Sequence, residues 1–112
     1  MEYVDPSKFH NLDIRTGTVV EAAEFFGARK PAYKLTIDFG NEIGLKKTSA
    51  QITDLYKLEQ LIGKQVIAVI NLPAKQIGKY LSECLVLGAV ASGGEVTLLV
   101  TDQTCMNGER IS

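Results

Sequence analysis

The sequence predicts a small all-β barrel of five strands, with one short helix between the third and fourth strands and short extensions at the two ends. Three observations lead to this prediction. The chain has 112 residues, of which 46% are hydrophobic, and this suits one globular domain over residues 1–112. Stretches with the β-strand pattern recur along the chain, separated by turn residues. Only one internal segment has the apolar spacing of a helix that packs on a core.

The first predicted strand runs from Ile14 to Phe25 and is rich in isoleucine, threonine and valine. Gly17 lies inside it, and in a small barrel such a glycine commonly marks a bulge or a bend. The second strand, Tyr33–Phe39, alternates apolar and polar residues with a period of two. Gly40-Asn41 then predicts a tight turn into a third strand over residues 42–49.

The predicted helix covers residues 50–61, and Gly63 ends it. The remaining segments are an apolar strand, a polar basic loop, a strand and a final strand, at residues 65–72, 73–81, 82–90 and 95–101. Asp5-Pro6 predicts a capped helical turn in the extension 1–11. Five strands with a helix after the third is the order of an OB-fold barrel. SH3-like and other small barrels share most of this pattern.

Charge is unevenly distributed along the chain. The formal net charge is −1, which favours no class of partner. Residues 29–82, however, carry nine cations against four carboxylates, a net of +5, and the segments on either side are each −3. An OB barrel binds ligands on strands two and three and on the loop between strands four and five. The cations expected in those elements are Lys34, Lys46, Lys47, Lys75 and Lys79. They would either attract phosphates or form an ordinary solvated surface.

Aromatic side chains are the usual partners of unpaired bases. Most aromatic residues here fall on core-facing positions, and Tyr80, in the basic loop, is the candidate for an exposed stacking residue. A polypeptide ligand needs exposed apolar surface instead. Phe25 and Phe26 before a turn, and Leu81 in the basic loop, are the candidates for that role.

The residues that catalysis or metal binding requires are scarce. His10 is the single histidine, and Cys84 and Cys105 are far apart, so the sequence shows neither a nucleophile–base pair nor a zinc-ligand pattern. We expect no enzyme activity, no cofactor and no metal. The longest apolar run, Val66–Ile70, is too short to span a bilayer. We therefore expect a soluble cytoplasmic protein without membrane insertion.

Several separated motifs resemble one known family. They are Leu12–Val19 (LDIRTGTV), Ser49–Thr53 (SAQIT), Asn71–Gly78 (NLPAKQIG) and Ser82–Gly88 (SECLVLG). Together they resemble the tRNA-binding OB domain, which occurs alone, in synthetases for methionine and phenylalanine, and in the cytokine EMAP II. The sequences of these motifs are most similar to those of the free-standing bacterial CsaA-type proteins, and the resemblance extends from about residue 12 to 111.

The resemblance implies a homodimer that binds tRNA largely by shape and backbone, and that dimerises through its N-terminal helix region and the tail 102–111. Arg15 falls on a family arginine, with RNA contact or a salt bridge to Asp13 as its alternative roles. The family's polar and basic positions beside the groove correspond to Ser49, Asn71, Ser82 and Lys75. The CsaA type further implies an export-related chaperone with SecA and unfolded precursor proteins as partners.

This chain departs from the family pattern at three places. Lys79 stands where relatives carry glycine, Leu85 replaces a methionine, and Phe25-Phe26 replaces a His-Pro pair. The first two changes lie in the expected groove. Two hypotheses follow: a tRNA-binding module, or a protein-binding secretion chaperone for which RNA binding is secondary.

Overall fold

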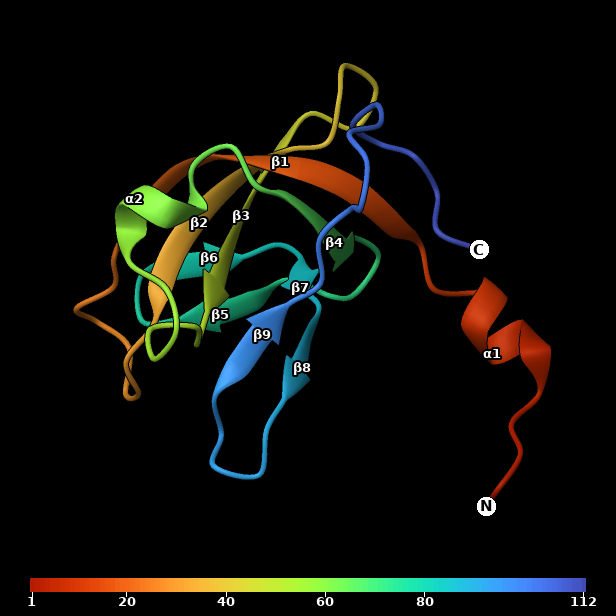
Figure 1. Ribbon diagram of the computed structural model, residues 1–112, viewed down its shortest axis with the longest axis horizontal. Coiled ribbons are helices and arrows are strands. Elements are labelled where there is room, and N and C mark those ends of the chain that lie inside the picture. Colours follow the sequence, from red (N-terminus) through yellow and green to blue (C-terminus); the bar gives the residue numbers. More distant parts are fainter.

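The 11-residue strand β1 (Ile14–Glu24) is the longest element of the computed structural model, which describes residues 1–112, and it belongs to both halves of the barrel. Its first half pairs antiparallel with β4 (Gln65–Val69), and its second half pairs antiparallel with β2 (Tyr33–Asp38). A β-bulge at Val20, within the half that pairs with β2, bends the strand. Figure 1 shows β1 arching over the other strands.

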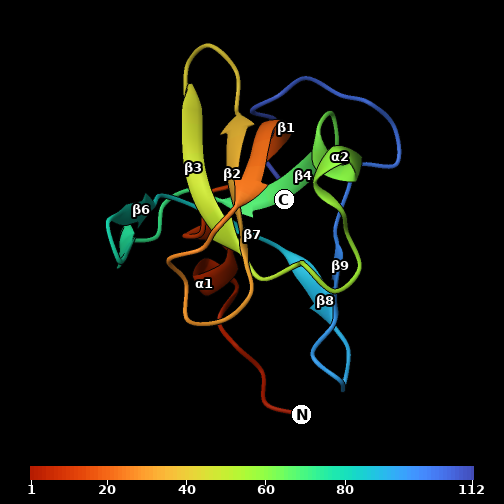
Figure 2. The same cartoon turned by 90° about the vertical axis from the view of Figure 1, so that its left-hand side faces the viewer.

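The remaining barrel strands are β3 (Leu45–Ala50) and β7 (Leu85–Val86), and the antiparallel sheet has the order β3-β2-β1-β4-β7. Its two edges approach each other, because the backbone N–H of Glu83 donates to the carbonyl of Lys47 at 2.7 Å. The result is a nearly closed five-stranded barrel with one short helix between β3 and β4 (Figures 1 and 2). This is the OB fold, and the predicted fold class is confirmed.

The alternation predicted along β2 determines which side chains fill the barrel. Tyr33, Leu35, Ile37 and Phe39 are at most 6% exposed and belong to one cluster of twelve buried residues. The intervening side chains consequently lie on the outer face of the strand. That outer face becomes important for the candidate site.

Gly17 has a different role from the predicted bulge or bend. The bulge lies three residues later, at Val20. A Cβ atom on Gly17 would lie 2.6 Å from Cγ2 of Ile37 and 2.8 Å from the ring of Phe39. Glycine is therefore needed here because the β1 backbone passes directly against core side chains.

The helix is shorter than the prediction of residues 50–61, since α2 spans only Leu58–Leu61. Tyr56, which falls inside the predicted helix, is instead held in a loop by partners from two strands. Its hydroxyl accepts from the N–H of Leu98 at 3.0 Å, and its carbonyl accepts from the hydroxyl of Tyr33 at 2.7 Å. These long-range hydrogen bonds outweigh the local helical spacing.

The segment predicted as a polar basic loop, residues 73–81, contains a small hairpin. Its strands are β5 (Lys75–Ile77) and β6 (Tyr80–Ser82). The two-residue turn has Gly78 at its first position with φ +60°, a conformation that favours glycine. Lys79, which departs from the family glycine, occupies the second position and has no positive φ. The turn needs a positive φ only at Gly78, so a lysine at position 79 is tolerated.

The strand predicted over residues 82–90 is divided because the chain changes partner at Leu87. The N–H of Leu87 donates to the carbonyl of Ile67 in β4 at 2.9 Å, and its carbonyl accepts from the N–H of Leu99 at 3.1 Å. The chain then forms a separate hairpin of β8 (Gly88–Val90) and β9 (Val96–Leu98), which extends from the barrel in Figure 1.

Both chain ends lie on one side of the molecule (Figure 1). The predicted N-terminal turn is confirmed as α1 (Pro6–His10), because the carboxylate of Asp5 accepts from the N–H of Ser7 at 2.9 Å. The C-terminal tail returns along β1, where the N–H of Gly108 donates to the carbonyl of Thr16 at 2.7 Å. Neither helix has the length and apolar content needed to cross a membrane.

Candidate nucleic-acid interface

The outer face of β2 and β3 brings together three of the predicted RNA-binding residues. Lys34 is paired in register with Ser49, and the neighbouring pair places Lys47 opposite Thr36. All four alternate with core residues and therefore project outward. Lys46 is paired with the buried Ile37 instead, so it lies on the opposite face of β3, at the end of the barrel.

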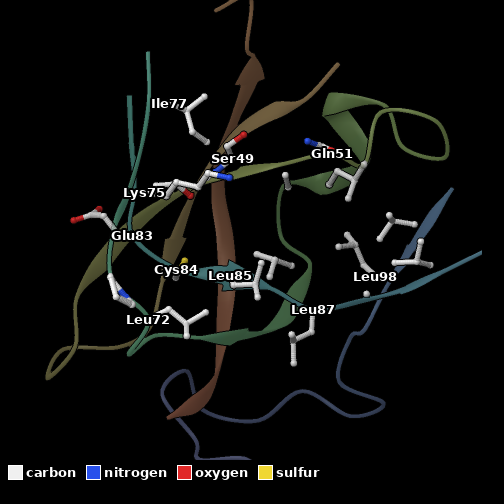
Figure 3. A pocket seen from close by; sticks show the side chains of 18 residues that line it. Ser49, Gln51, Leu72, Lys75, Ile77, Glu83, Cys84, Leu85, Leu87 and Leu98 are labelled. Atoms are coloured by element: carbon white, nitrogen blue, oxygen red, sulfur yellow. Dashed lines mark hydrogen bonds between the residues drawn. The ribbon is translucent and has the colours of Figure 1, made fainter. Parts of the chain in front are cut away.

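A groove of about 550 Å³ lies beside this face, between the end of β3, the β5–β6 hairpin and strands β7 to β9. Figure 3 shows its lining, with apolar side chains such as Leu98 on one side and Lys75, Ser49 and Glu83 at the hairpin end. The groove thus combines an apolar wall with a polar, partly cationic rim.

The two serines of the groove differ in whether their hydroxyl groups have hydrogen-bond partners within the protein. The hydroxyl oxygen of Ser82 accepts from the N–H of Ser49 at 3.1 Å and lies 3.3 Å from the hydroxyl of Thr48. Thr48 gives its own proton to the carbonyl of Cys84 at 2.7 Å, so Ser82 donates to Thr48. Ser82 therefore fastens the hairpin to β3, whereas the Ser49 hydroxyl has no protein partner and is available to a ligand.

Tyr80, predicted as an exposed stacking residue, is half-buried and is held by the barrel. Its hydroxyl donates to the carbonyl of Thr48 at 3.1 Å, and its ring meets the edge of Phe25 with centroids 5.1 Å apart. Burial raises the pKa of Tyr80 to about 12. The ammonium of Lys34 lies 5.7 Å from the Tyr80 ring and 5.9 Å from the Phe25 ring, within the range of cation–π attraction.

The nine cations of residues 29–82 are free of ion pairs. Both salt bridges of the chain use Asp13, which bonds Arg15 at 2.6 Å and lies 3.9 Å from Arg110. No carboxylate oxygen lies within 4.0 Å of any cation between Arg29 and Lys79. Their charge is therefore not neutralised by carboxylates of the same chain. Cations in this state are available to bind phosphates.

Arg15 and Asn71 have internal partners. Arg15 donates to Asp13 and to the carbonyl of Gly108 at 2.9 Å, and the hydrogen bond to Asp13 raises the pKa of its guanidinium further. The amide of Asn71 accepts from the N–H of Asp13 and donates to the carbonyl of Asn11, both at 2.8 Å. Of the two roles weighed for Arg15, these contacts favour the salt bridge. Both residues hold the terminal segments against the barrel, and neither lines the groove.

The residues predicted for peptide binding do not form one patch. Phe26 is 92% exposed, whereas Phe25 is half-buried against Tyr80. Leu81, 44% exposed, lies on the face of β6 opposite Tyr80, because side chains alternate along a strand. The apolar residues of the groove, including Leu72 and Leu85, were not predicted as site residues.

Leu85 is a departure from the family pattern that was expected in the groove, and the structure places it in the groove lining. It lies in β7, which ends before Leu87, where the chain changes partner and the predicted strand is divided. Alternation within that strand could have pointed to it, but the break could not be predicted. No group of three histidine, cysteine or carboxylate side chains is placed to hold a metal ion.

Many barrels of this fold bind oligonucleotides or oligosaccharides on the face that corresponds to β2 and β3 here. Comparison with known families defines this protein further. The model of the tRNA binding domain family matches residues 14–110, and the chain therefore belongs to that family.

Two solved structures are similar over their whole length. The chaperone CsaA of Bacillus anthracis has 48% identity and a TM-score of 0.94, with 99% of this chain and 100% of that chain covered. The CsaA chaperone protein of Picrophilus torridus has 47% identity and a TM-score of 0.92, with 98% and 100% covered. The resemblance to CsaA-type proteins is thus confirmed.

The chain is also similar to part of a much larger enzyme. The methionine–tRNA ligase of Methanocaldococcus jannaschii is 38% identical over 112 residues, which are 99% of this chain and 17% of that protein. The chain therefore spans about a sixth of the length of such ligases.

Proposed function

We propose that the chain binds tRNA, as one domain and without catalysing a reaction, through the outer face of β2–β3 and the neighbouring β5–β6 hairpin. The observation that carries the proposal is the group of cations on this face and hairpin, Lys34, Lys47, Lys75 and Lys79, none of which is ion-paired. Membership of the tRNA binding domain family supports tRNA as the nucleic acid. Contacts of lysines with phosphates position an RNA without reading its sequence.

We assign the predicted residues different roles in this interface. The direct phosphate contacts come from Lys34, Lys47, Lys75 and Lys79, with the free hydroxyl of Ser49 as a further donor. Tyr80 and Ser82 keep the hairpin on β3. Lys46, at the barrel end, adds to the positive electrostatic potential of the interface. Arg15 and Asn71 hold the terminal segments against the barrel and do not contact the RNA.

A gel shift with bulk tRNA at several salt concentrations tests the proposal. The logarithm of the association constant should fall linearly with the logarithm of the salt concentration, by about 0.7 to 0.9 per phosphate contacted. Absence of a shift at low salt, with folded protein, contradicts the proposal. An oligonucleotide duplex with the same number of phosphates shows how much of the affinity depends on tRNA shape.

The second candidate function is a chaperone for unfolded precursors, with SecA as an export partner. The specific observation in its favour is the apolar lining of the groove, where Leu72 is 40% and Leu85 is 49% exposed. The CsaA proteins that resemble this chain are described as chaperones. Suppression of aggregation that Leu85→Ser abolishes, while Phe25→Ser and Phe26→Ser together retain it, would support the groove as the binding surface. No suppression by the wild type removes this function.

Homodimerisation and a cytoplasmic location are also part of the proposal. The N-terminal segment exposes apolar side chains that nothing in the chain covers, namely Tyr3 at 89% and Val4 at 65%, and Met106 in the tail is 76% exposed. A second copy would bury such residues. Size-exclusion chromatography of the wild type and of a Tyr3→Ser, Met106→Ser variant tests this, with a monomeric wild type as the contradicting result.

A further inference from the structure

The loop between β1 and β2, residues 25–32, presents one aromatic ring to solvent from a fixed position. Phe26 is 92% exposed. The residue before it is anchored twice, since the N–H of Phe25 donates to the carbonyl of Ala32 at 3.2 Å and its ring meets that of Tyr80. Tyr80 is fixed in turn by its hydrogen bond to Thr48. The backbone that carries Phe26 is therefore held on one side by the barrel.

The tip of the β5–β6 hairpin lies next to this loop. A Cβ atom on Gly78 would lie 3.9 Å from the carbonyl oxygen of Gly27, and the Phe25–Tyr80 contact joins the same two segments. The exposed ring of Phe26 is therefore part of a surface formed by two loops that are far apart in the sequence.

Four cations lie in the segments that form this surface. Arg29 and Lys30 follow it in the same loop, Lys79 is at the neighbouring hairpin turn, and Lys34 lies against the Phe25 and Tyr80 rings. None of the four is ion-paired, and Glu24, at the end of β1, is the nearest carboxylate residue along the chain. A ligand that suits this surface has a flat apolar face and negative charge next to it.

A nucleotide has this combination, because its base has a π-face and its phosphates are anionic. An unfolded polypeptide has no regular negative charge, and it is better served by a continuous apolar groove such as the one beside β7. We propose that Phe26 stacks on one unpaired base of the bound RNA, while Arg29, Lys30 and Lys79 hold the neighbouring phosphates. This inference rests on the proposed RNA-binding function and assigns a particular contact within it.

The chain contains no tryptophan, so Phe26→Trp introduces a single fluorescent reporter at the site. Because residue 26 is almost fully exposed, the substitution leaves the core unchanged. The probes are bulk tRNA, an eight-nucleotide oligouridylate and an abasic oligomer of the same length and phosphate number. We expect tRNA and oligouridylate to quench the tryptophan emission of this variant at saturation, and the abasic oligomer to bind without comparable quenching.

Affinity measurements on two further variants separate stacking from general apolarity. Phe26→Leu keeps an apolar side chain without a π-face, and we expect it to weaken oligouridylate binding about tenfold while it leaves binding of the abasic oligomer unchanged. Ile62→Leu, at an exposed position after α2, is the matched control and should change neither affinity.

Three results would overturn the inference. They are equal quenching by the abasic oligomer, unchanged oligouridylate affinity in Phe26→Leu, and quenching by an unfolded polypeptide without tryptophan, such as reduced insulin B chain, but not by RNA. Failure of the proposed function looks different, since the wild type would then bind neither tRNA nor oligouridylate at low salt. Binding of tRNA to Phe26→Trp with unchanged tryptophan emission rejects the stacking contact alone.

Discussion

The side-chain carbonyl of Gln65 accepts a hydrogen bond from the backbone N–H of Cys105 at 3.1 Å, and the amide of Gln65 donates to the carbonyl of Cys105 at 2.7 Å. The same side chain bonds the hydroxyl of Thr101 at 2.8 Å and the amide oxygen of Asn107 at 3.0 Å. One residue at the start of β4 thus fixes several points of the C-terminal tail. The tail and the barrel are therefore expected to unfold together.

Replacing Gln65 tests that coupling. Gln65→Ala removes these hydrogen bonds and should lower the free energy of unfolding by about 1 to 2 kcal/mol, since the site is partly exposed. Hydrogen exchange should become faster at the tail amides, with Cys105 first among them. Gln103→Ala, at an exposed position of the tail without a side-chain hydrogen bond, is the control and should stay within about 0.5 kcal/mol of the wild type. Unchanged exchange in the tail contradicts the coupling.

Gly17→Ala tests the close approach of β1 to the core. The new methyl would overlap Ile37 and Phe39, and overpacking of this kind typically costs about 1 to 3 kcal/mol. Gly93→Ala is a matched control, because its nearest neighbour is the flexible end of the Glu95 side chain. Denaturant unfolding should show a lower midpoint for the first variant only. Equal midpoints would mean that β1 can move away from the core at no cost.

Ser49 and Ser82 should respond in opposite ways to loss of the hydroxyl. Ser82→Ala leaves the N–H of Ser49 without its partner and should cost about 1 kcal/mol of stability. Ser49→Ala removes a hydroxyl without a protein partner, so stability should be unchanged while tRNA affinity falls several-fold. Thermal unfolding and tRNA titration of both variants measure the two effects. A stability loss in Ser49→Ala as large as in Ser82→Ala would contradict the assignment.

Cys84 makes stability sensitive to alkaline pH. Burial raises the pKa of its thiol from 9.0 to about 11, so above pH 9 the unfolded state loses this proton before the folded state does. The stability contributed by the protonated thiol is complete below pH 9 and is lost as the pH rises towards 11, by an amount of the order of 2 kcal/mol. Cys84→Ala should reduce this alkaline loss when denaturant unfolding is compared at about pH 8 and about pH 10.5. The same dependence in both proteins would contradict it.

The local patterns of the sequence were sufficient for the barrel and for part of the site. Alternation at Tyr33–Phe39 correctly predicted both the core face and the outward direction of Lys34. The helix could not be placed correctly, because Tyr56 is held by Leu98 and Tyr33. Neither partner is adjacent to it in the sequence.

Long-range contacts also explain why the roles of some site residues could not be predicted from the sequence. The contacts of Asn71 with Asp13 and Asn11 join segments 58 and 60 residues apart, and no local pattern distinguishes such an asparagine from one that faces a ligand. The exposure of Phe26 beside the anchored Phe25 likewise depends on a contact with Tyr80 across two loops.

The salt dependence of tRNA binding in two charge-matched variants tests the central claim most directly. Lys47→Gln with Lys75→Gln removes cations from the proposed face, and Lys57→Gln with Lys64→Gln removes the same charge beside α2, on the side of the barrel opposite the β5–β6 hairpin in Figure 2. We predict weaker binding in the first variant, with a slope against salt lower by about 1 per lysine that contacts a phosphate, and a slope close to wild type in the second. Equal slopes in the two variants would contradict an RNA interface on β2, β3 and the hairpin.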